Sequence, residues 1–170
     1  TTGDSALPGA TETVMGSVLG TVPRDSFVLS TKVGRILIDA PEREGTDFGA
    51  FSDLPPKFDQ LDYSRDGIMR SVEASLERLG LDKIDILLIH DPHPAPWDDI
   101  KHTIVEQAYP AVEELRSQGV VGAIGAGLNE NHKFIYMAER GDYDCVLIAL
   151  CYNLIEHSAL DELLPLCERR

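Results

Sequence analysis

Two ionisable residues stand where apolar runs of the sequence end. Lys32 follows the largely apolar run 27–31 and is separated from Gly34 by one residue, and His90 ends the run 84–89. Such apolar runs are typical of buried strands, and in α/β folds substrates reach the carboxyl ends of the strands. Because a lysine and a histidine stabilise a buried sheet poorly, both positions favour a functional role.

Each of these residues also has a structural interpretation. Lys32 could extend from the end of its strand into solvent, and His90 could be a core histidine whose hydrogen bonds are satisfied. A metal site built on His90 and His93 is disfavoured, because Pro92 lies between them and the sequence offers no further ligands at a suitable spacing. We therefore expect no metal.

Composition and charge exclude several classes of protein. The 170 residues suffice for one domain with a core, and the hydrophobic fraction of 43% is ordinary for a globular protein. The formal net charge of −14 argues against binding to nucleic acid or to an anionic membrane. No apolar run approaches the ~20 residues that span a bilayer, and no signal peptide opens the chain. Three cysteines without CxxC spacing indicate reduced thiols, so we expect a cytoplasmic protein.

The sequence predicts alternating strands and helices. Thr11 is the expected N-cap of the first helix, Ser64 opens the second, and Gly80 stops it. Residues 34–62 are expected to form a long functional or mobile loop, since they contain several glycines and prolines. The predicted helices cover residues 11–19, 64–79, 104–118, 131–140 and a segment from 158, and the predicted strands cover 27–31, 84–89, 120–125 and 145–151.

This alternation predicts an α/β fold with a parallel sheet and right-handed crossovers. A doubly wound sheet and a (β/α)8 barrel both fit the order of elements. No GxGxxG follows the first strand, which disfavours the dinucleotide-binding doubly wound fold. A complete barrel needs about 250 residues. We therefore expect a partial (β/α)8 TIM barrel, with about half of the barrel present.

Four stretches, in their order and spacing, resemble the aldo/keto reductase superfamily. They are Ser30–Arg35 (STKVGR), Asp62–Gly80 (DYSRDGIMRSVEASLERLG), Asp85–Asp91 (DILLIHD) and Val121–Glu130 (VGAIGAGLNE). The sequence is most similar to the branch of aldose 1-dehydrogenase, L-fucose or L-galactose dehydrogenase and pyridoxal 4-dehydrogenase. The resemblance covers residues 11–170. It implies a single NAD(P)-dependent oxidoreductase domain over residues 1–170, truncated at both ends.

The resemblance also implies site residues and a cofactor. The family is a (β/α)8 barrel that uses NAD or NADP without a metal, and its active site is a tetrad of Asp, Tyr, Lys and His. Lys32 matches the lysine, His90 matches the histidine that orients the substrate oxygen, and Asn129 matches the position that holds the nicotinamide amide. From the residues alone, Asn129 could equally cap the helix that begins near Asn131.

The sequence departs from the family pattern at the Asp and the Tyr. In the family these two precede a helix start that Thr11–Gly16 matches, but residues 5–10 contain no tyrosine, and Asp4 is a poor substitute for the aspartate. Tyr63 is the nearest tyrosine, and we expect it to pack rather than to act as the general acid. Many relatives have a glutamine near the position of Ala149. The strands after Arg170 that grip the cofactor in the family are also expected to be missing.

The chemistry explains why such groups would be needed. Reduction of a carbonyl builds negative charge on its oxygen, so a donor aimed at that oxygen and an acid that supplies the proton lower the barrier. A nearby lysine makes a tyrosinate easier to form, and the cofactor carries the hydride. We therefore expect hydride transfer between NAD or NADP, with NAD favoured by the branch, and the C1 of an aldose or another small aldehyde or alcohol.

Two alternatives from other classes stay open. The chain could be a catalytically dead, truncated relative that acts as a binding or oligomerising module. A metal-free hydrolase or isomerase on a parallel sheet is weaker, because the sequence has no nucleophile elbow. The expected partner is a small sugar or aldehyde, with no nucleic acid and no membrane, and the oligomeric state is left open.

Overall fold

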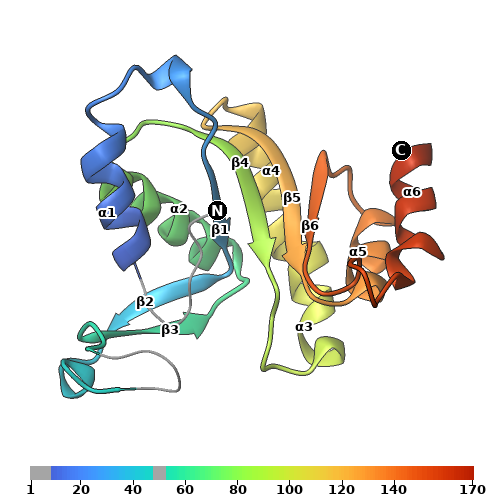
Figure 1. Ribbon diagram of the computed structural model, residues 1–170, viewed down its shortest axis with the longest axis horizontal. Helices are drawn as coiled ribbons and strands as arrows, with labels where there is room; N and C mark the ends of the chain where they lie inside the picture. The colour runs from blue at the N-terminus through green and yellow to red at the C-terminus, as the bar shows by residue number, and fades with distance from the viewer. Residues whose placement is uncertain (1–8, 48–52) are drawn as a thin grey trace.

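A four-stranded parallel sheet forms the centre of the chain, whose computed structural model describes residues 9–47 and 53–170. Its strands are β1 (Ser30–Val33), β4 (Ile84–His90), β5 (Val121–Leu128) and β6 (Cys145–Ile148), in the order β1-β4-β5-β6. All neighbouring strands run parallel. Figure 1 shows α4 behind the sheet, α1 and α2 beyond β1, and α5 and α6 beyond β6. The predicted α/β class and parallel sheet are confirmed.

Six α-helices accompany the sheet in the described part of the chain. The helix α2 has the predicted ends, because the Ser64 side chain accepts a hydrogen bond from the Gly67 amide at 3.1 Å and Gly80 adopts the left-handed conformation. The helices are α1 (Ala10–Leu19), α2 (Arg65–Leu79), α3 (Trp97–Thr103), α4 (Tyr109–Ser117), α5 (Asn131–Ala138) and α6 (Leu163–Arg169).

The predicted N-cap of the first helix is wrong. The helix α1 begins one residue earlier than expected, and Gly9 is its N-cap, without a side-chain hydrogen bond. The hydroxyl of Thr13 donates to the Gly9 carbonyl at 2.9 Å, which does not cap the free amides of this helix end.

The helix predicted over 104–118 starts earlier and is not regular. It begins as α3 at Trp97, widens into a π-helical turn over Ile104–Ala108, and continues as α4. Pro110 has no amide hydrogen to donate to the preceding turn, and a wider turn accommodates its ring.

The predicted long loop over 34–62 is also wrong. It contains an antiparallel hairpin of β2 (Arg35–Asp39) and β3 (Lys57–Leu61), with a 3-10 turn over Pro41–Arg43. Gly45 and Pro55 lie between the two strands and not within them. These turn-forming residues led to the prediction of a loop over the whole segment, although strands flank them. The hairpin packs against α2.

Several strand and helix ends differ from the prediction. The strand β1 begins at Ser30, so that Lys32 lies inside it, β5 extends to Leu128, and β6 stops at Ile148. The last segment forms a 3-10 turn over Ser158–Leu160 before α6, whose first turn holds Pro165, a position that a proline tolerates.

The register divides the sheet into two faces. Lys32 lies opposite Leu88, Leu88 opposite Gly125, and His90 opposite Gly127. Since side chains alternate along a strand, Lys32 and His90 share one face. The residues of the other face pack against the helices. This core includes Val33, Leu87, Ile89, Ile124, Ala126 and Leu128 from the strands and Ile68, Val72, Ile104, Val112 and Met137 from the helices. Among the described residues no helix combines the length and hydropathy that crossing a bilayer would require.

Candidate active site

Lys32 and His90 come together because their strands are neighbours. Gly127, on the same face of β5, leaves the room that the lysine uses: a Cβ atom at this position would stand 3.1 Å from Lys32 Cε. The aliphatic part of Lys32 therefore packs against Gly127, which is the residue of β5 that pairs with His90. The structure thus brings two of the three predicted site residues to one face of the sheet.

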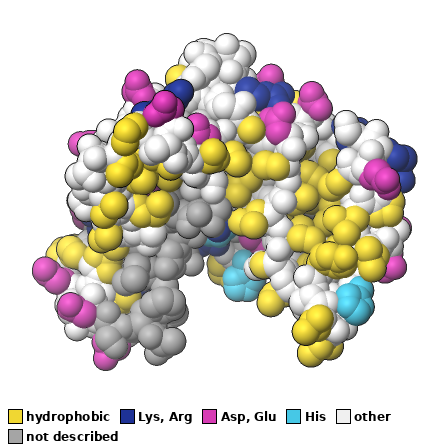
Figure 2. Space-filling model, turned by 45° about the horizontal axis from the view of Figure 1, so that its top comes forward, with side chains coloured by type: hydrophobic (Ala, Val, Ile, Leu, Met, Phe, Trp, Pro, Cys, Tyr) yellow, Lys and Arg dark blue, Asp and Glu magenta, His cyan; other side chains and the backbone are white. Residues whose placement is uncertain are grey.

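The face that carries Lys32 stays partly uncovered. Leu147 on β6 pairs with Gly127, which places it on this face, and it is 41% exposed. The space-filling view shows hydrophobic side chains gathered over a hollowed face of the molecule (Figure 2). A small organic ligand could approach Lys32 from such a surface.

Tyr63 is buried beside the site and contacts the backbone of His90. It is 1% exposed, and its hydroxyl donates a hydrogen bond to the backbone carbonyl of His90 at 2.7 Å. Burial raises the pKa of Tyr63 well above its ordinary value. As expected, this tyrosine packs, and it holds the end of β4.

Gly34 is required for this packing. Its φ of +103° is a conformation that other residues rarely adopt, and a Cβ atom here would stand 2.3 Å from the Tyr63 ring. Gly34 therefore leaves the room that the Tyr63 ring needs to pack against the end of β1.

His90 is uncharged at neutral pH. Burial, followed by the positive charges of Arg35 and Lys32, lowers the pKa of His90 to about 4. The charge of Lys32 is thus close enough to act on the imidazole. A neutral imidazole offers one N–H donor and one acceptor nitrogen.

Asn129 lies at the same edge, directly after β5. It is exposed, and its side-chain amide makes no hydrogen bond with another described residue. The N-cap of α5 is Glu130, so the capping role that was open for Asn129 is wrong. A hollow of about 660 Å³ begins at Asn129 and extends along the loop after β6, with Cys151 and Ser158 in its lining.

Sequence reasoning missed Asp91, the residue after His90. It is 4% exposed and accepts hydrogen bonds from the backbone amide of Asn129 at 2.9 Å, the Lys133 ammonium at 3.0 Å and the backbone amide of His93 at 3.2 Å. Burial opposes the ionisation of Asp91, but these donors outweigh it and hold its pKa below the ordinary value. A carboxylate directly after a strand end was the signal that could have revealed it.

Cys151 was also missed as a neighbour of the site. It is buried, and its Sγ lies 3.0 Å from the Asn129 carbonyl, to which the thiol donates. All three cysteines are free. Among residues 9–47 and 53–170, no group of three or more His, Cys, Asp or Glu side chains could hold a metal ion.

Glu12 links the first helix to the strand of Lys32. Its buried carboxylate pairs with the Arg78 guanidinium at 2.6 Å and accepts a hydrogen bond from the hydroxyl of Thr31, the neighbour of Lys32. The predicted stand-in Asp4 and residues 5–8 lie outside the described residues.

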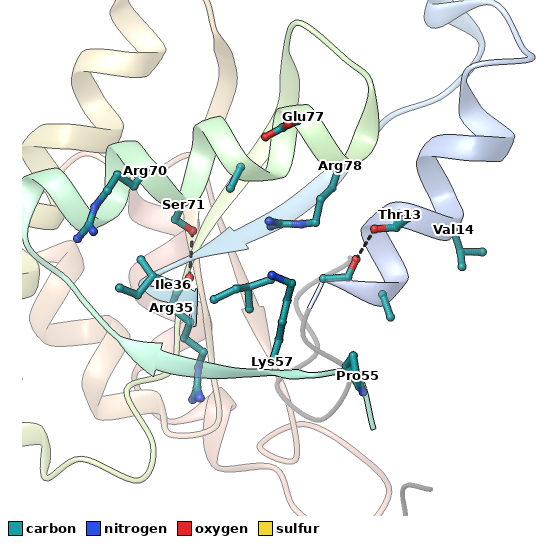
Figure 3. Close-up of a pocket in the computed structure, with 14 residues that line it drawn as sticks. Thr13, Val14, Arg35, Ile36, Pro55, Lys57, Arg70, Ser71, Glu77 and Arg78 are labelled. Atoms are coloured by element: carbon teal, nitrogen blue, oxygen red, sulfur yellow. Dashed lines mark hydrogen bonds between the residues drawn. The ribbon is translucent and has the colours of Figure 1, made fainter. Parts of the chain in front are cut away.

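The cavity of about 910 Å³ between α1, α2 and the β2–β3 hairpin is a separate feature (Figure 3). Its lining includes Arg35, Lys57, Arg70 and Arg78, but each of these cations pairs with a carboxylate. Neither Lys32, His90 nor Asn129 lines it. The candidate site is therefore the edge of the sheet and not this cavity.

Comparison with known proteins identifies relatives of the chain. The aldo/keto reductase family model matches residues 7–170. The chain is 38% identical to a D-threo-aldose 1-dehydrogenase from Pseudomonas, over 94% of this chain and 48% of the relative. It is 32% identical to a pyridoxal 4-dehydrogenase from Microbacterium luteolum (95% and 51%) and 31% identical to an L-galactose dehydrogenase from Arabidopsis thaliana (85% and 38%). The chain thus spans about half the length of these first two relatives, and the predicted resemblance is confirmed.

Solved structures agree on the fold. A glycerol dehydrogenase from Gluconobacter oxydans superimposes with a TM-score of 0.68 at 22% identity, over 95% of this chain and 42% of its own. An aldo/keto reductase from Klebsiella pneumoniae, solved with NADP and acetate, gives a TM-score of 0.61 at 22% identity (95% and 45%). The described strands and helices are therefore part of a (β/α)8 barrel, as the sequence predicts.

Proposed function

This chain belongs to the aldo/keto reductase family, and on that premise we propose that it transfers a hydride between a nicotinamide dinucleotide and a small aldose, aldehyde or alcohol. The observation that carries this proposal is the shared face of Lys32 and His90 at the ends of β1 and β4, with the exposed Asn129 at the same edge. The similarity to an aldose 1-dehydrogenase and an L-galactose dehydrogenase supports oxidation of an aldose at C1. Family membership favours this function over a non-catalytic binding module.

The residues present fit the nicotinamide end of NAD or NADP. The side-chain amide of Asn129 is exposed and has no hydrogen bond within the described part of the chain, so it is available to the carboxamide of the cofactor. Gly127 keeps the surface beside Lys32 free of a side chain. When bound, the nicotinamide accepts or supplies the hydride.

Lys32 and His90 would act on the substrate oxygen. The positive charge of Lys32 stabilises the negative charge that develops on this oxygen. Because the pKa of His90 is about 4, its imidazole stays neutral and can donate one hydrogen bond to the same oxygen. The two side chains thus orient the substrate and favour the transition state.

The proton step has no matching tyrosine in the sequence before α1. Residues 5–10 contain none, and the hydroxyl of Tyr63 is buried and bonded to the His90 carbonyl. Loss of a general acid or base typically slows a reaction by ~10²–10⁴. Tyr63 is therefore not the group that we propose for the proton step.

Location and partner belong to the same proposal. The three free cysteines fit the reducing environment of the cytoplasm, and the partner is a small sugar or aldehyde. No oligomeric state is assigned.

Turnover assays test the proposal. The purified chain is mixed with NAD or NADP and with L-fucose, L-galactose or pyridoxal, and the absorbance of reduced nicotinamide is followed. We expect an increase with at least one pair, which His90→Gln reduces without a change in the melting temperature. A chain that melts cooperatively but turns over none of these pairs would overturn the proposal.

A further inference from the structure

The two peptide groups that flank Asn129 are fixed by side chains from distant parts of the chain. The backbone amide of Asn129 donates to Asp91 Oδ2 at 2.9 Å, and its backbone carbonyl accepts from Cys151 Sγ at 3.0 Å. The amide belongs to the peptide before the Asn129 Cα and the carbonyl to the peptide after it. Together, these two hydrogen bonds therefore restrict both backbone dihedral angles of Asn129.

The Asp91 carboxylate is itself held rigidly. Lys133 Nζ lies 3.0 Å from Asp91 Oδ1, both residues are at most 5% exposed, and Lys133 also pairs with Glu130 at 2.7 Å. The Asp91 amide donates to the Gly127 carbonyl at 2.9 Å, which joins β4 to β5 at the same point. A buried carboxylate with three donors is a strong and well-oriented acceptor.

Asp91 directly follows His90, so it connects the two halves of the site. Its backbone continues from the strand that carries His90, and its carboxylate fixes the backbone of Asn129. Because the side-chain amide of Asn129 makes no hydrogen bond with another described residue, the backbone of Asn129 largely determines where this group lies.

We infer that Asp91 and Cys151 are positioning residues for the nicotinamide ring, because they hold Asn129 in place at the edge of the sheet. This inference rests on the proposed function. Glu139 provides the contrast: it is an exposed carboxylate that pairs with Arg140 at 3.0 Å, and it contacts neither Asp91 nor Lys133 among the described ion pairs.

Binding measurements with two related ligands test the inference. NADH contains the nicotinamide ring and ADP-ribose lacks it, so the dissociation constants of both are measured for the full chain and its variants. Asp91→Asn and Cys151→Val are each expected to weaken NADH binding about tenfold and to leave ADP-ribose binding unchanged. Cys151→Ser keeps a donor and should restore NADH binding, and the control Glu139→Gln should behave as the wild type.

A purely structural role would give a different pattern, since it would weaken both ligands together or neither of them. Either of these results would overturn the inference. Amide hydrogen exchange at Asn129 provides a readout without ligand, and in Asp91→Asn it should accelerate about tenfold relative to the Leu128 amide. Unchanged exchange would overturn the anchoring itself. Accelerated exchange in a chain that binds no NADH would instead refute the proposed function and, with it, the nicotinamide role.

Discussion

The hydroxyl of Tyr63 donates a hydrogen bond to the backbone carbonyl of His90 at 2.7 Å. This contact supports β4 and occupies the proton of the Tyr63 hydroxyl, which favours a structural role for this tyrosine over proton transfer. We predict that Tyr63→Phe lowers the free energy of unfolding by about 1–2 kcal/mol and slows turnover by less than about tenfold, far below the ~10²–10⁴ that loss of a general acid costs. Denaturant melts and the nicotinamide assay measure both effects. A loss of turnover in that larger range, with stability unchanged, would make Tyr63 the acid.

Gly34 and Gly80 allow a matched test of the ring that packs under β1. Both have positive φ, +103° and +66°, but only at Gly34 would a Cβ atom meet another group, the Tyr63 ring. We predict that Gly80→Ala costs about 1 kcal/mol of unfolding free energy, from backbone strain alone. Gly34→Ala should cost about 3 kcal/mol, because the ring must also move. Equal costs in urea melts would show that the ring does not constrain this position.

The neutral state of His90 predicts a pH dependence of stability. Its pKa is about 4 in the folded chain and about 6.5 when unfolded, so the unfolded state binds more protons between these values. The stabilisation is present above the unfolded pKa and is lost as the pH falls through this window, by up to about 3 kcal/mol.

Unfolding free energies at about pH 7 and about pH 4.5 measure this loss. The variant His90→Gln does not titrate, so its stability should fall less over the same interval. His132, which is exposed, supplies the control substitution His132→Gln. If His90→Gln loses as much stability as the wild type on acidification, the histidine is not the group responsible.

The buried carboxylate of Glu12 makes Arg78 important for the placement of β1. Arg78→Met removes the guanidinium from Glu12, which is only 5% exposed, and should destabilise the chain by about 3 kcal/mol. Arg140→Met removes an exposed ion pair with Glu139 and should change little. Thermal melts distinguish the two variants. A small effect of Arg78→Met would show that the ion pair does not hold α1 against α2.

The sequence predicted those parts of the fold that depend on local signals. The cap at Ser64 and the left-handed residue Gly80 define the two ends of α2, and each signal depends only on a few neighbouring residues. The strand β4 is likewise recognisable from its own apolar run. The β2–β3 hairpin was missed because its strands are half-buried and of mixed composition, and because its pairing joins Arg35 to Leu61 across a long segment.

The same distinction applies to the site. Lys32 and His90 could be identified from their places at the ends of apolar runs, and the parallel order of strands brings them together. The hydrogen bonds of Asn129 with Asp91 and Cys151 join residues 38 and 22 positions apart. These contacts depend on strand register and on the path of the loop after β6, which local patterns do not specify.

The most direct test of the proposed chemistry compares two lysine variants in the nicotinamide assay. Lys32→Met removes the charge at the end of β1, and Lys57→Met removes the charge of a partly exposed lysine paired with Asp39. With both variants shown to be folded, we predict that Lys32→Met lowers the rate of nicotinamide reduction by at least about 10²-fold, whereas Lys57→Met leaves it unchanged. Turnover that survives in Lys32→Met at the wild-type rate would contradict the assignment of this site.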